Sequence, residues 1–196
     1  EITKTNLKGQ TIEFGAYKEK NKNFSYHIKE KKYLNYSNIF VNKNSNIIYA
    51  DLTKKLKLSS NKYKNIIIFN VLEHLQNHNF TFKELNRILK KGGKLVGSTP
   101  FLYQIHGAPK DYFRFSKDYF NYIFKKNNFK NIKVINLGFG PFVASYSLLQ
   151  SYLKFLPLIN QIIFLVCYLL DGFIQIFVKT NLNEIYPIGY FFEIKK

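Results

Sequence analysis

Residues able to move protons are concentrated in one stretch of this sequence, PFLYQIHGAPKDYFRFS at residues 100–116. It holds His106, Asp111, Tyr112 and Arg114, the last being one of only two arginines in the chain. A histidine side chain ordinarily titrates near neutrality, so His106 is the natural candidate for a general base. Asp111 either orients that imidazole or pairs with Arg114, and the pair would then clamp the loop and cap the next helix.

A second polar pair, Glu73-His74, follows a continuous apolar run, IIIF at residues 66–69. Such a run is typical of a strand that is covered on both faces. In open α/β sheets ligands bind beyond the carboxyl ends of the strands, and residues 70–74 leave such an end. This turn is therefore a second candidate for a binding site.

The elements that must position these groups alternate between short β-rich runs and helix-like stretches, which predicts a parallel α/β sheet. We expect one helix over residues 82–90, with Gly92-Gly93 as its C-cap turn. A second helix is expected over residues 116–124, with Ser116 as its N-cap. The expected strands cover residues 10–14, 33–41, 47–49, 66–69, 94–99, 131–137 and 185–194.

Three stretches together resemble a known family. NIIIFNVLEHL (65–75) and FKELNRILKKGGKLVGSTPF (82–101) resemble the second half of a type 11 S-adenosylmethionine (SAM) methyltransferase domain. There a strand ends in a VLEH turn, and a helix of the form E-x-x-R-x-L-K-x-G-G follows. The loop at 100–116 resembles a P-F-x-x-x-x-H-x-x-P-x-D-Y-x-R-[FY]-[ST] pattern. That pattern is typical of a subgroup associated with surface-polysaccharide or glycolipid biosynthesis.

The resemblance implies a class I, Rossmann-like fold: a seven-stranded sheet with helices on both faces and an antiparallel final strand. It also implies SAM as cofactor and O-methylation of a small or a glycan- or lipid-linked acceptor. Methyl transfer from a sulfonium is an in-line displacement that needs an aligned acceptor, and a base when the acceptor is a hydroxyl. His106, helped by Asp111 or Tyr103, would serve that acceptor.

The cofactor motifs of the family match the first half of the chain less closely. An acid and a first glycine are present, but Tyr17 replaces the second glycine, where close approach to the cofactor normally requires one. No acid lies between residues 31 and 50 to hold the ribose, so a neutral residue is expected to substitute. Strand-end solvation is the alternative explanation for Glu13 and Asp51. The resemblance places Glu13, Gly15, Ala16, Ser37, Asn38, Asp51, Leu52, Asn70 and Glu73 at the cofactor.

The Glu73-His74 pair also resembles the E-x-x-E-H turn that binds a divalent metal in some quinone-pathway O-methyltransferases. Asn70 replaces the first acid here, which leaves one carboxylate and one imidazole. Two ligands are too few for a metal site, so no metal is expected. Glu73 and His74 are expected to shape the methionine end of the cofactor site or to cap the following helix.

The composition indicates which classes of binding partner to expect. The formal net charge is +18, yet nearly all of it is lysine scattered along the chain, whereas nucleic-acid readout favours arginine forks. We therefore expect no nucleic-acid partner. An RNA-binding or RNA-modifying domain stays open as an alternative, as does a degenerate methyltransferase fold that only binds. Cys167 stands alone, which excludes an internal disulfide and fits a cytoplasmic protein. The sequence contains no Met, so its N-terminus is expected to be processed, trimmed or incomplete.

Residues 142–178 are far more apolar than the rest, and LKFLPLINQIIFLVCYLL (153–170) nearly reaches the length of a membrane span. Because Pro157, Asn160 and Gln161 interrupt that run, we expect a pair of helices. They would either pack on the domain or lie in a membrane interface, at the inner face of the cytoplasmic membrane. The sequence thus predicts a single domain over residues 1–196 with an apolar helical insertion at 142–178.

Overall fold

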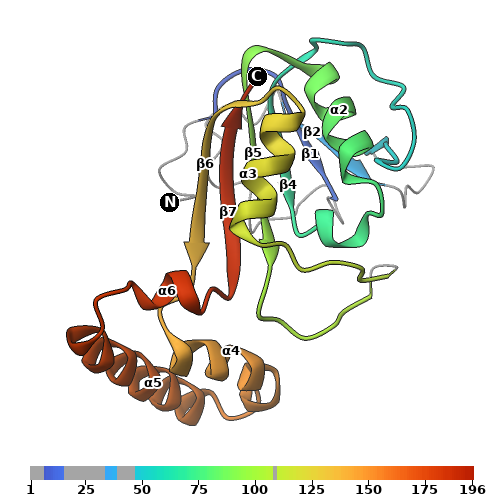
Figure 1. The fold of residues 1–196 in the computed structure, drawn as a ribbon. Helices are drawn as coiled ribbons and strands as arrows, with labels where there is room; N and C mark the ends of the chain where they lie inside the picture. Colours follow the sequence, from blue (N-terminus) through green and yellow to red (C-terminus); the bar gives the residue numbers. More distant parts are fainter. Residues whose placement is uncertain (1–6, 16–33, 39–46, 108–109) are drawn as a thin grey trace.

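A β-sheet forms the centre of the computed structural model, which describes residues 7–15, 34–38, 47–107 and 110–196 (Figure 1). The strand order is β3-β2-β1-β4-β5-β7-β6. Six strands have four residues or more, and the expected third strand is reduced to the two-residue β3. The strands are β1 (Thr11–Phe14), β2 (Leu34–Asn38), β3 (Ile48–Tyr49), β4 (Tyr63–Phe69), β5 (Leu89–Pro100), β6 (Lys130–Leu137) and β7 (Gly189–Lys195).

Strands β1 to β5 pair in parallel, whereas β7 is antiparallel to both β5 and β6, which confirms the antiparallel final strand. β4 lies at the centre, between β1 and β5. Its side chains alternate between two cores: Ile66 and Ile68 join the larger one, and Ile67 joins the smaller one on the opposite face. Burial on both faces is why this strand reads as an uninterrupted apolar run.

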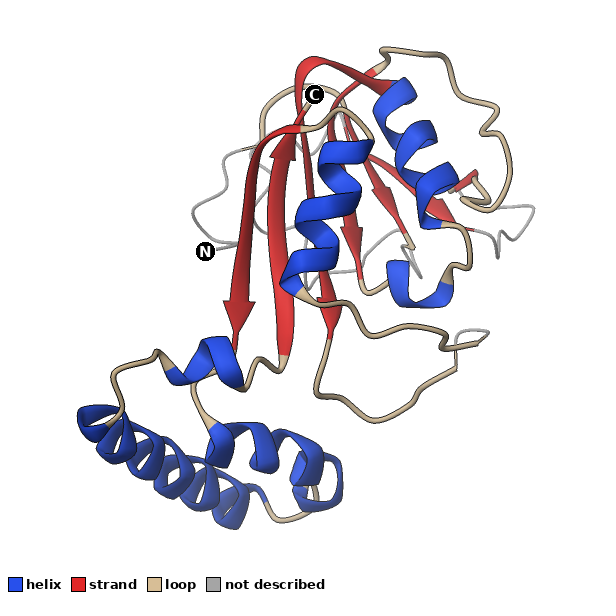
Figure 2. Ribbon diagram, viewed as in Figure 1, coloured by secondary structure: helices blue, strands red, loops and turns tan. Residues whose placement is uncertain are grey.

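Two helices, α2 (His78–Ile88) and α3 (Lys117–Lys126), cover the face with the larger core (Figure 2). α2 begins four residues before the expected start because the Asn77 side chain accepts a hydrogen bond from the Phe80 amide and caps it. Ser116 caps α3 in the same way through the Tyr119 amide, as expected.

The opposite face carries the smaller core, formed by Leu7, Ile67, Val96 and Phe191. Within the described ranges no helix packs on it, so the expected helices on both faces are seen on one face only. The apolar insertion does not pack on this face either. It lies beyond the ends of β6 and β7, away from both faces of the sheet (Figure 1).

That insertion consists of α4 (Pro141–Leu153) and α5 (Pro157–Phe177), followed by the short α6 (Leu182–Ile185). The expected pair of helices is confirmed, with the break just before Pro157, whereas Asn160 and Gln161 lie within α5 and do not interrupt it. Pro157 occupies its first turn, where the missing N–H costs nothing, and the Asn160 side chain accepts a hydrogen bond from the Tyr146 hydroxyl of α4. Asp171 does not end α5 but lies inside it, fully buried, and accepts hydrogen bonds from the Phe142 and Val143 amides at the start of α4.

Two other expectations are corrected. Gly92-Gly93 is no helix C-cap: α2 ends at Ile88 and the glycines lie within β5. A Cβ on Gly93 would meet the Lys64 carbonyl oxygen at 2.8 Å, so the close approach of β4 requires glycine there. β7 starts at Gly189 rather than at residue 185. The chain before it forms the short helix α6, which ends at Ile185 and is capped by the Asn181 side chain.

The E-x-x-R part of the α2 motif is a structural clamp. Arg87 donates to both carboxylate oxygens of Glu84 and to the carbonyl oxygens of Leu56 and Leu58. The Glu84 carboxylate in turn accepts from the Leu56 amide, at 3.0 Å. The pair therefore ties the segment between β3 and β4 to α2.

Replacing the guanidinium in an Arg87→Met variant leaves those carbonyls and the Glu84 carboxylate without their donor. We expect the free energy of unfolding to fall by about 2 kcal/mol, measured by urea denaturation. Lys83→Met, at an exposed position of the same helix, is the matched control and should change little. Equal losses in both variants would contradict the clamp.

Candidate functional site

The carboxyl ends of β1, β4 and β5 converge at one edge of the sheet. Gly15 follows β1 with a φ of +80°, and a Cβ there would lie 2.4 Å from Val71 Cγ2, so this turn is closed to any side chain. Asn70 follows β4 with a φ of +50°. Its amide donates to the Ser98 carbonyl, and its side-chain oxygen accepts from the Ser98 hydroxyl of β5. Backbone from three strands is therefore held together at this edge.

A buried acid, Glu13, lies beside this edge on β1, opposite Ile67 of β4. Its Oε2 has no hydrogen-bond partner among the described residues, and burial raises its pKa to about 7. Ser37, expected as a substitute ribose ligand, is itself fully buried and donates its hydroxyl to the Glu13 carbonyl. Ser37 thus ties β2 to β1 and presents no group to a ligand.

The other expected cofactor residues are more scattered. Asp51 follows β3, and one of its carboxylate oxygens accepts hydrogen bonds from the amide and hydroxyl of Thr53. Together with Lys54 these contacts keep the pKa of Asp51 below its usual range. Leu52 is buried in the larger core. Ala16 and the side chain of Asn38 lie outside the described residues.

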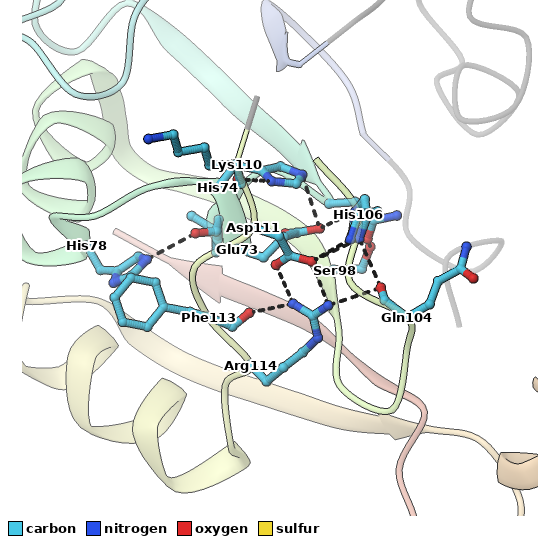
Figure 3. Close-up of polar contacts among 12 residues, drawn as sticks. Glu73, His74, His78, Ser98, Gln104, His106, Lys110, Asp111, Phe113 and Arg114 are labelled. Atoms are coloured by element: carbon cyan, nitrogen blue, oxygen red, sulfur yellow. Dashed lines mark hydrogen bonds and ion pairs between the residues drawn. The ribbon is translucent and has the colours of Figure 1, made fainter. Parts of the chain in front are cut away.

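A cluster of three titratable side chains lies just beyond Asn70 (Figure 3). Glu73 and His74 belong to a single 3-10 turn (Leu72–His74) after β4, and His106 reaches them from the loop after β5. The Nε2 atoms of both histidines lie 3.8 Å from Glu73 Oε1. Glu73 is fully buried, and its burial, more than the nearby Asp111 charge, raises its pKa to about 7.

The loop that carries His106 is held by Asp111 and Arg114. Arg114 donates to both oxygens of Asp111 and to the Gln104 carbonyl, and Asp111 accepts from the His106 amide at 3.0 Å. The Arg114 guanidinium holds the pKa of Asp111 well below its usual range. Asp111 Oδ2 also lies 3.2 Å from His106 Nδ1. The two interpretations of Asp111 are therefore both met: it pairs with Arg114 and orients the imidazole (Figure 3).

Backbone hydrogen bonds fasten the same loop to the β4 turn. The amides of Tyr112 and Phe113 donate to the Glu73 carbonyl. His78, to which sequence reasoning gave no role, donates from Nε2 to the Leu72 carbonyl oxygen, 3.0 Å away, and packs edge-on against Phe113 and Phe115. Desolvation lowers the pKa of His78, which favours its neutral form. His78 therefore holds the turn that carries Glu73 and His74.

Two adjoining clefts open beside this loop. One, of about 330 Å³, is lined by Tyr103, Asp111, Arg114 and Leu148 among others. The second, of about 260 Å³, shares Tyr103 and Leu148 and is otherwise polar. Its other lining residues are Gln104, Ser147, Gln150, Ser151, Lys154 and Asn160. Tyr103 is half exposed and packs edge-on against His106, with ring centroids 5.4 Å apart.

The meeting of His106 with Glu73 and His74 is what sequence reasoning missed. Thirty-two positions separate His74 from His106 in the sequence, and no periodic spacing links them. The signal that was present lay in Asp111 and Arg114, whose pairing folds the loop back onto the turn.

Comparison with known proteins agrees with this architecture. A family model described as a methyltransferase domain matches residues 25–97. A SAM-dependent methyltransferase structure from Archaeoglobus fulgidus superposes with a TM-score of 0.60 at 14% identity, covering 96% of this chain and 86% of that one. One from Mesorhizobium loti gives 0.58 at 12% identity, covering 99% and 94%.

A third similar structure is phosphoethanolamine N-methyltransferase 2 from Haemonchus contortus, solved with phosphomonomethylethanolamine and S-adenosylhomocysteine. Its TM-score is 0.57 at 14% identity, and the alignment covers 98% of this chain but 49% of that one. The present chain thus spans about half the length of that enzyme. No curated protein sequence matches the chain. The chain has the Rossmann-like fold of class I SAM-dependent methyltransferases.

The Glu13 carboxyl makes stability depend on pH. It ionises near 4.5 in the unfolded chain and near 7 in the fold. Between these pH values the Glu13 carboxyl keeps its proton in the folded state and has lost it in the unfolded state. The contribution of Glu13 to the free energy of unfolding is therefore most favourable at low pH and is lost as the pH rises towards 7.

Glu13→Gln removes that titration. Relative to the parent, we expect the variant to gain up to ~3 kcal/mol of unfolding free energy between pH 5 and pH 8. Urea denaturation across that range measures it, with the exposed-site variant Glu184→Gln as control. A difference that does not change with pH would contradict the buried acid.

Proposed function

We propose that this protein is a SAM-dependent methyltransferase that acts on a hydroxyl of a glycan- or lipid-linked acceptor. The observation that carries the proposal is the edge where β1, β4 and β5 end. There the Gly15 turn packs against Val71 with no room for a side chain, beside the buried acid Glu13, whose Oε2 has no hydrogen-bond partner among the described residues. Backbone at such an edge can approach a ligand closely, and Glu13 could accept a hydrogen bond from it.

These residues suit the cofactor in chemical type. Gly15 and Asn70 would contact it through the backbone, Glu13 would accept a hydrogen bond, and Asp51 would face its adenosine end. The cofactor supplies a methyl group on a positively charged sulfonium. We favour an enzyme over a degenerate binding module because this chain has the tight Gly15 turn and, beside it, a buried acid whose Oε2 has no partner among the described residues.

On the acceptor side, His106 is the proposed base, oriented by Asp111, and Tyr103 lies against its ring. The two clefts that share Tyr103 and Leu148 provide room for the acceptor. Most of the residues that line one of them carry hydroxyl, amide or ammonium groups, which can form hydrogen bonds with a polyhydroxylated molecule such as a sugar.

A lipid-linked acceptor is supported by the helix next to these clefts. α5 is the one helix in the described ranges that is long and apolar enough to cross a membrane, and only 6% of its most apolar window is buried. Leu158, Ile162, Leu165 and Leu169 are all exposed. We propose that α5 contacts the membrane surface, to which the net charge of +18 would draw the protein when anionic lipids are present. This would place the protein at the inner face of the cytoplasmic membrane.

The cofactor proposal is tested by titration calorimetry with SAM and S-adenosylhomocysteine. Both should bind to the parent chain, and Gly15→Ala should weaken binding by ~10-fold or more, since its Cβ would displace Val71. Gly9→Ala is the matched control: Gly9 also has a positive φ, of +86°, but a Cβ there meets only Lys64 side-chain atoms at 3.5 Å or more. Absence of binding by the parent at millimolar ligand would refute the proposal.

The membrane proposal is tested by flotation with vesicles of phosphatidylcholine alone or mixed with phosphatidylglycerol. The parent should float with the anionic vesicles, and a Leu165→Asp, Leu169→Asp double variant should not, because charged side chains on α5 oppose insertion. The control carries the same change in charge at exposed aromatic positions elsewhere, Tyr49→Asp with Tyr122→Asp. Equal loss of flotation in both double variants would show simple charge attraction and contradict contact through α5.

A further inference from the structure

Three groups that commonly bind metal ions converge beyond the carboxyl end of β4. One imidazole nitrogen of His74, one of His106 and a carboxylate oxygen of Glu73 lie within 4.8 Å of one another. Both Nε2 atoms are 3.8 Å from the same oxygen, Glu73 Oε1 (Figure 3). Ligands of a tetrahedral zinc ion stand about 3.3 Å apart, given zinc–ligand distances of about 2.0–2.1 Å. Small side-chain rotations would therefore bring the three atoms to coordinating distance.

The Glu73 carboxylate has no hydrogen-bond partner in the part of the chain that the structure describes. Its side chain is fully buried, and neither carboxylate oxygen is hydrogen-bonded to any of the described residues. A distance of 3.8 Å to each imidazole is too long for a hydrogen bond. Buried carboxylates are normally paired or bound to a metal, because an isolated one is strongly destabilising. The Glu73 carboxylate points at the two histidines (Figure 3).

The surroundings of both histidines leave Nε2 available. His74 Nδ1 lies 2.7 Å from the Lys110 carbonyl oxygen, an acceptor that selects the ring form with its proton on Nδ1. His106 Nδ1 lies 3.2 Å from Asp111 Oδ2, which selects the same form. Each Nε2 then directs a lone pair towards Glu73. A carbonyl or carboxylate behind each ligating histidine is the usual outer shell of protein metal sites.

We propose that Glu73, His74 and His106 bind a divalent first-row transition-metal ion such as Zn²⁺. Two imidazoles and one carboxylate suit Zn²⁺, Co²⁺ or Fe²⁺ better than Mg²⁺ or Ca²⁺, which prefer oxygen ligands. Three protein ligands leave coordination positions open, as in catalytic rather than structural sites.

The open position gives the ion a role, which rests on the proposed function. An acceptor hydroxyl bound to the ion would have a lower pKa and a set orientation. With its Nε2 held by the ion, the His106 imidazole would not take the proton, and this role would replace the one proposed above. The bound hydroxyl would instead lose its proton to solvent, and its oxygen would take the methyl group as the C–S bond of the sulfonium breaks and S-adenosylhomocysteine leaves.

The experiment uses the full chain without a histidine tag, stripped with a chelator. Zn²⁺ affinity is measured by competition with a chromophoric chelator, and Co²⁺ binding by its visible absorption. We expect one ion per chain and a rise in melting temperature with Zn²⁺. Glu73→Gln, His74→Ala and His106→Ala should each weaken Zn²⁺ binding by ~10-fold or more.

Glu13→Gln is the matched control, because Glu13 is the other buried glutamate with an unpartnered carboxylate oxygen, and it lies outside the cluster. It should bind Zn²⁺ as the parent does. Glu73→Gln also keeps the test independent of folding, since it replaces a buried acid by a neutral side chain of the same shape. Its melting temperature without metal should not fall.

The outcomes separate this inference from the proposed function. A chain that binds S-adenosylhomocysteine but no stoichiometric Zn²⁺, or Zn²⁺ equally well in all three variants, overturns the metal site alone. A chain that binds Zn²⁺ through these residues but neither SAM nor S-adenosylhomocysteine keeps the site and refutes the methyltransferase.

Discussion

The pairing of β4 with β1 on one side and β5 on the other is the constraint on which the rest of the structure depends. β4 aligns Phe14 with Ile68 and Ile68 with Gly97, so β1 and β4 end within one residue of each other and β5 runs two residues beyond β4. The two faces of β4 hold the two cores together, because Ile66 and Ile68 point into one and Ile67 into the other. The candidate site forms because the segments that leave these three strands all begin at the same edge of the sheet.

What happens beyond that edge depends on a single folded loop. The Asp111–Arg114 pair bends the chain after β5, and two amides of the loop donate to the Glu73 carbonyl. His106 is thereby brought to a carboxylate that the sheet has already buried. The cluster thus combines a group fixed by the sheet with a group fixed by an ion pair, and both must form for its geometry to arise.

The helical insertion is held together by polar contacts between its two long helices. α4 and α5 are joined by the Asp171 carboxylate, which caps α4, and by the Tyr146–Asn160 hydrogen bond. These polar contacts hold the two helices together while most of the apolar side chains of α5 stay exposed. Exposed apolar area of this extent is a feature of interaction surfaces rather than of domain cores. The insertion lies beside the polar cleft, so an acceptor with both a sugar and a lipid part would find matching surfaces next to each other.

By itself, the sequence determined the parallel sheet, the positions of β4 and α3, and the edge at which ligands should bind. Those features follow from local signals: an apolar run, a Ser116 cap and a turn with glycine. Its motifs also pointed to the methyltransferase fold. Only the tertiary structure decided where side chains distant in sequence meet. The Ser37 hydroxyl donates to the Glu13 carbonyl of the neighbouring strand. Gly93 is required because the Lys64 backbone comes close to it, and not because a helix ends there.

His106 shows the same limit at the site. Its type and its loop indicated a base, but its meeting with Glu73 and His74 depends on an ion pair and on backbone hydrogen bonds to residues about forty positions away. Asp171 likewise lies inside α5, yet its carboxylate caps the start of α4. Local pattern determines which element a residue joins. The partner of a buried polar group is decided only when the chain closes around it, because that partner comes from whichever segment the packing brings there.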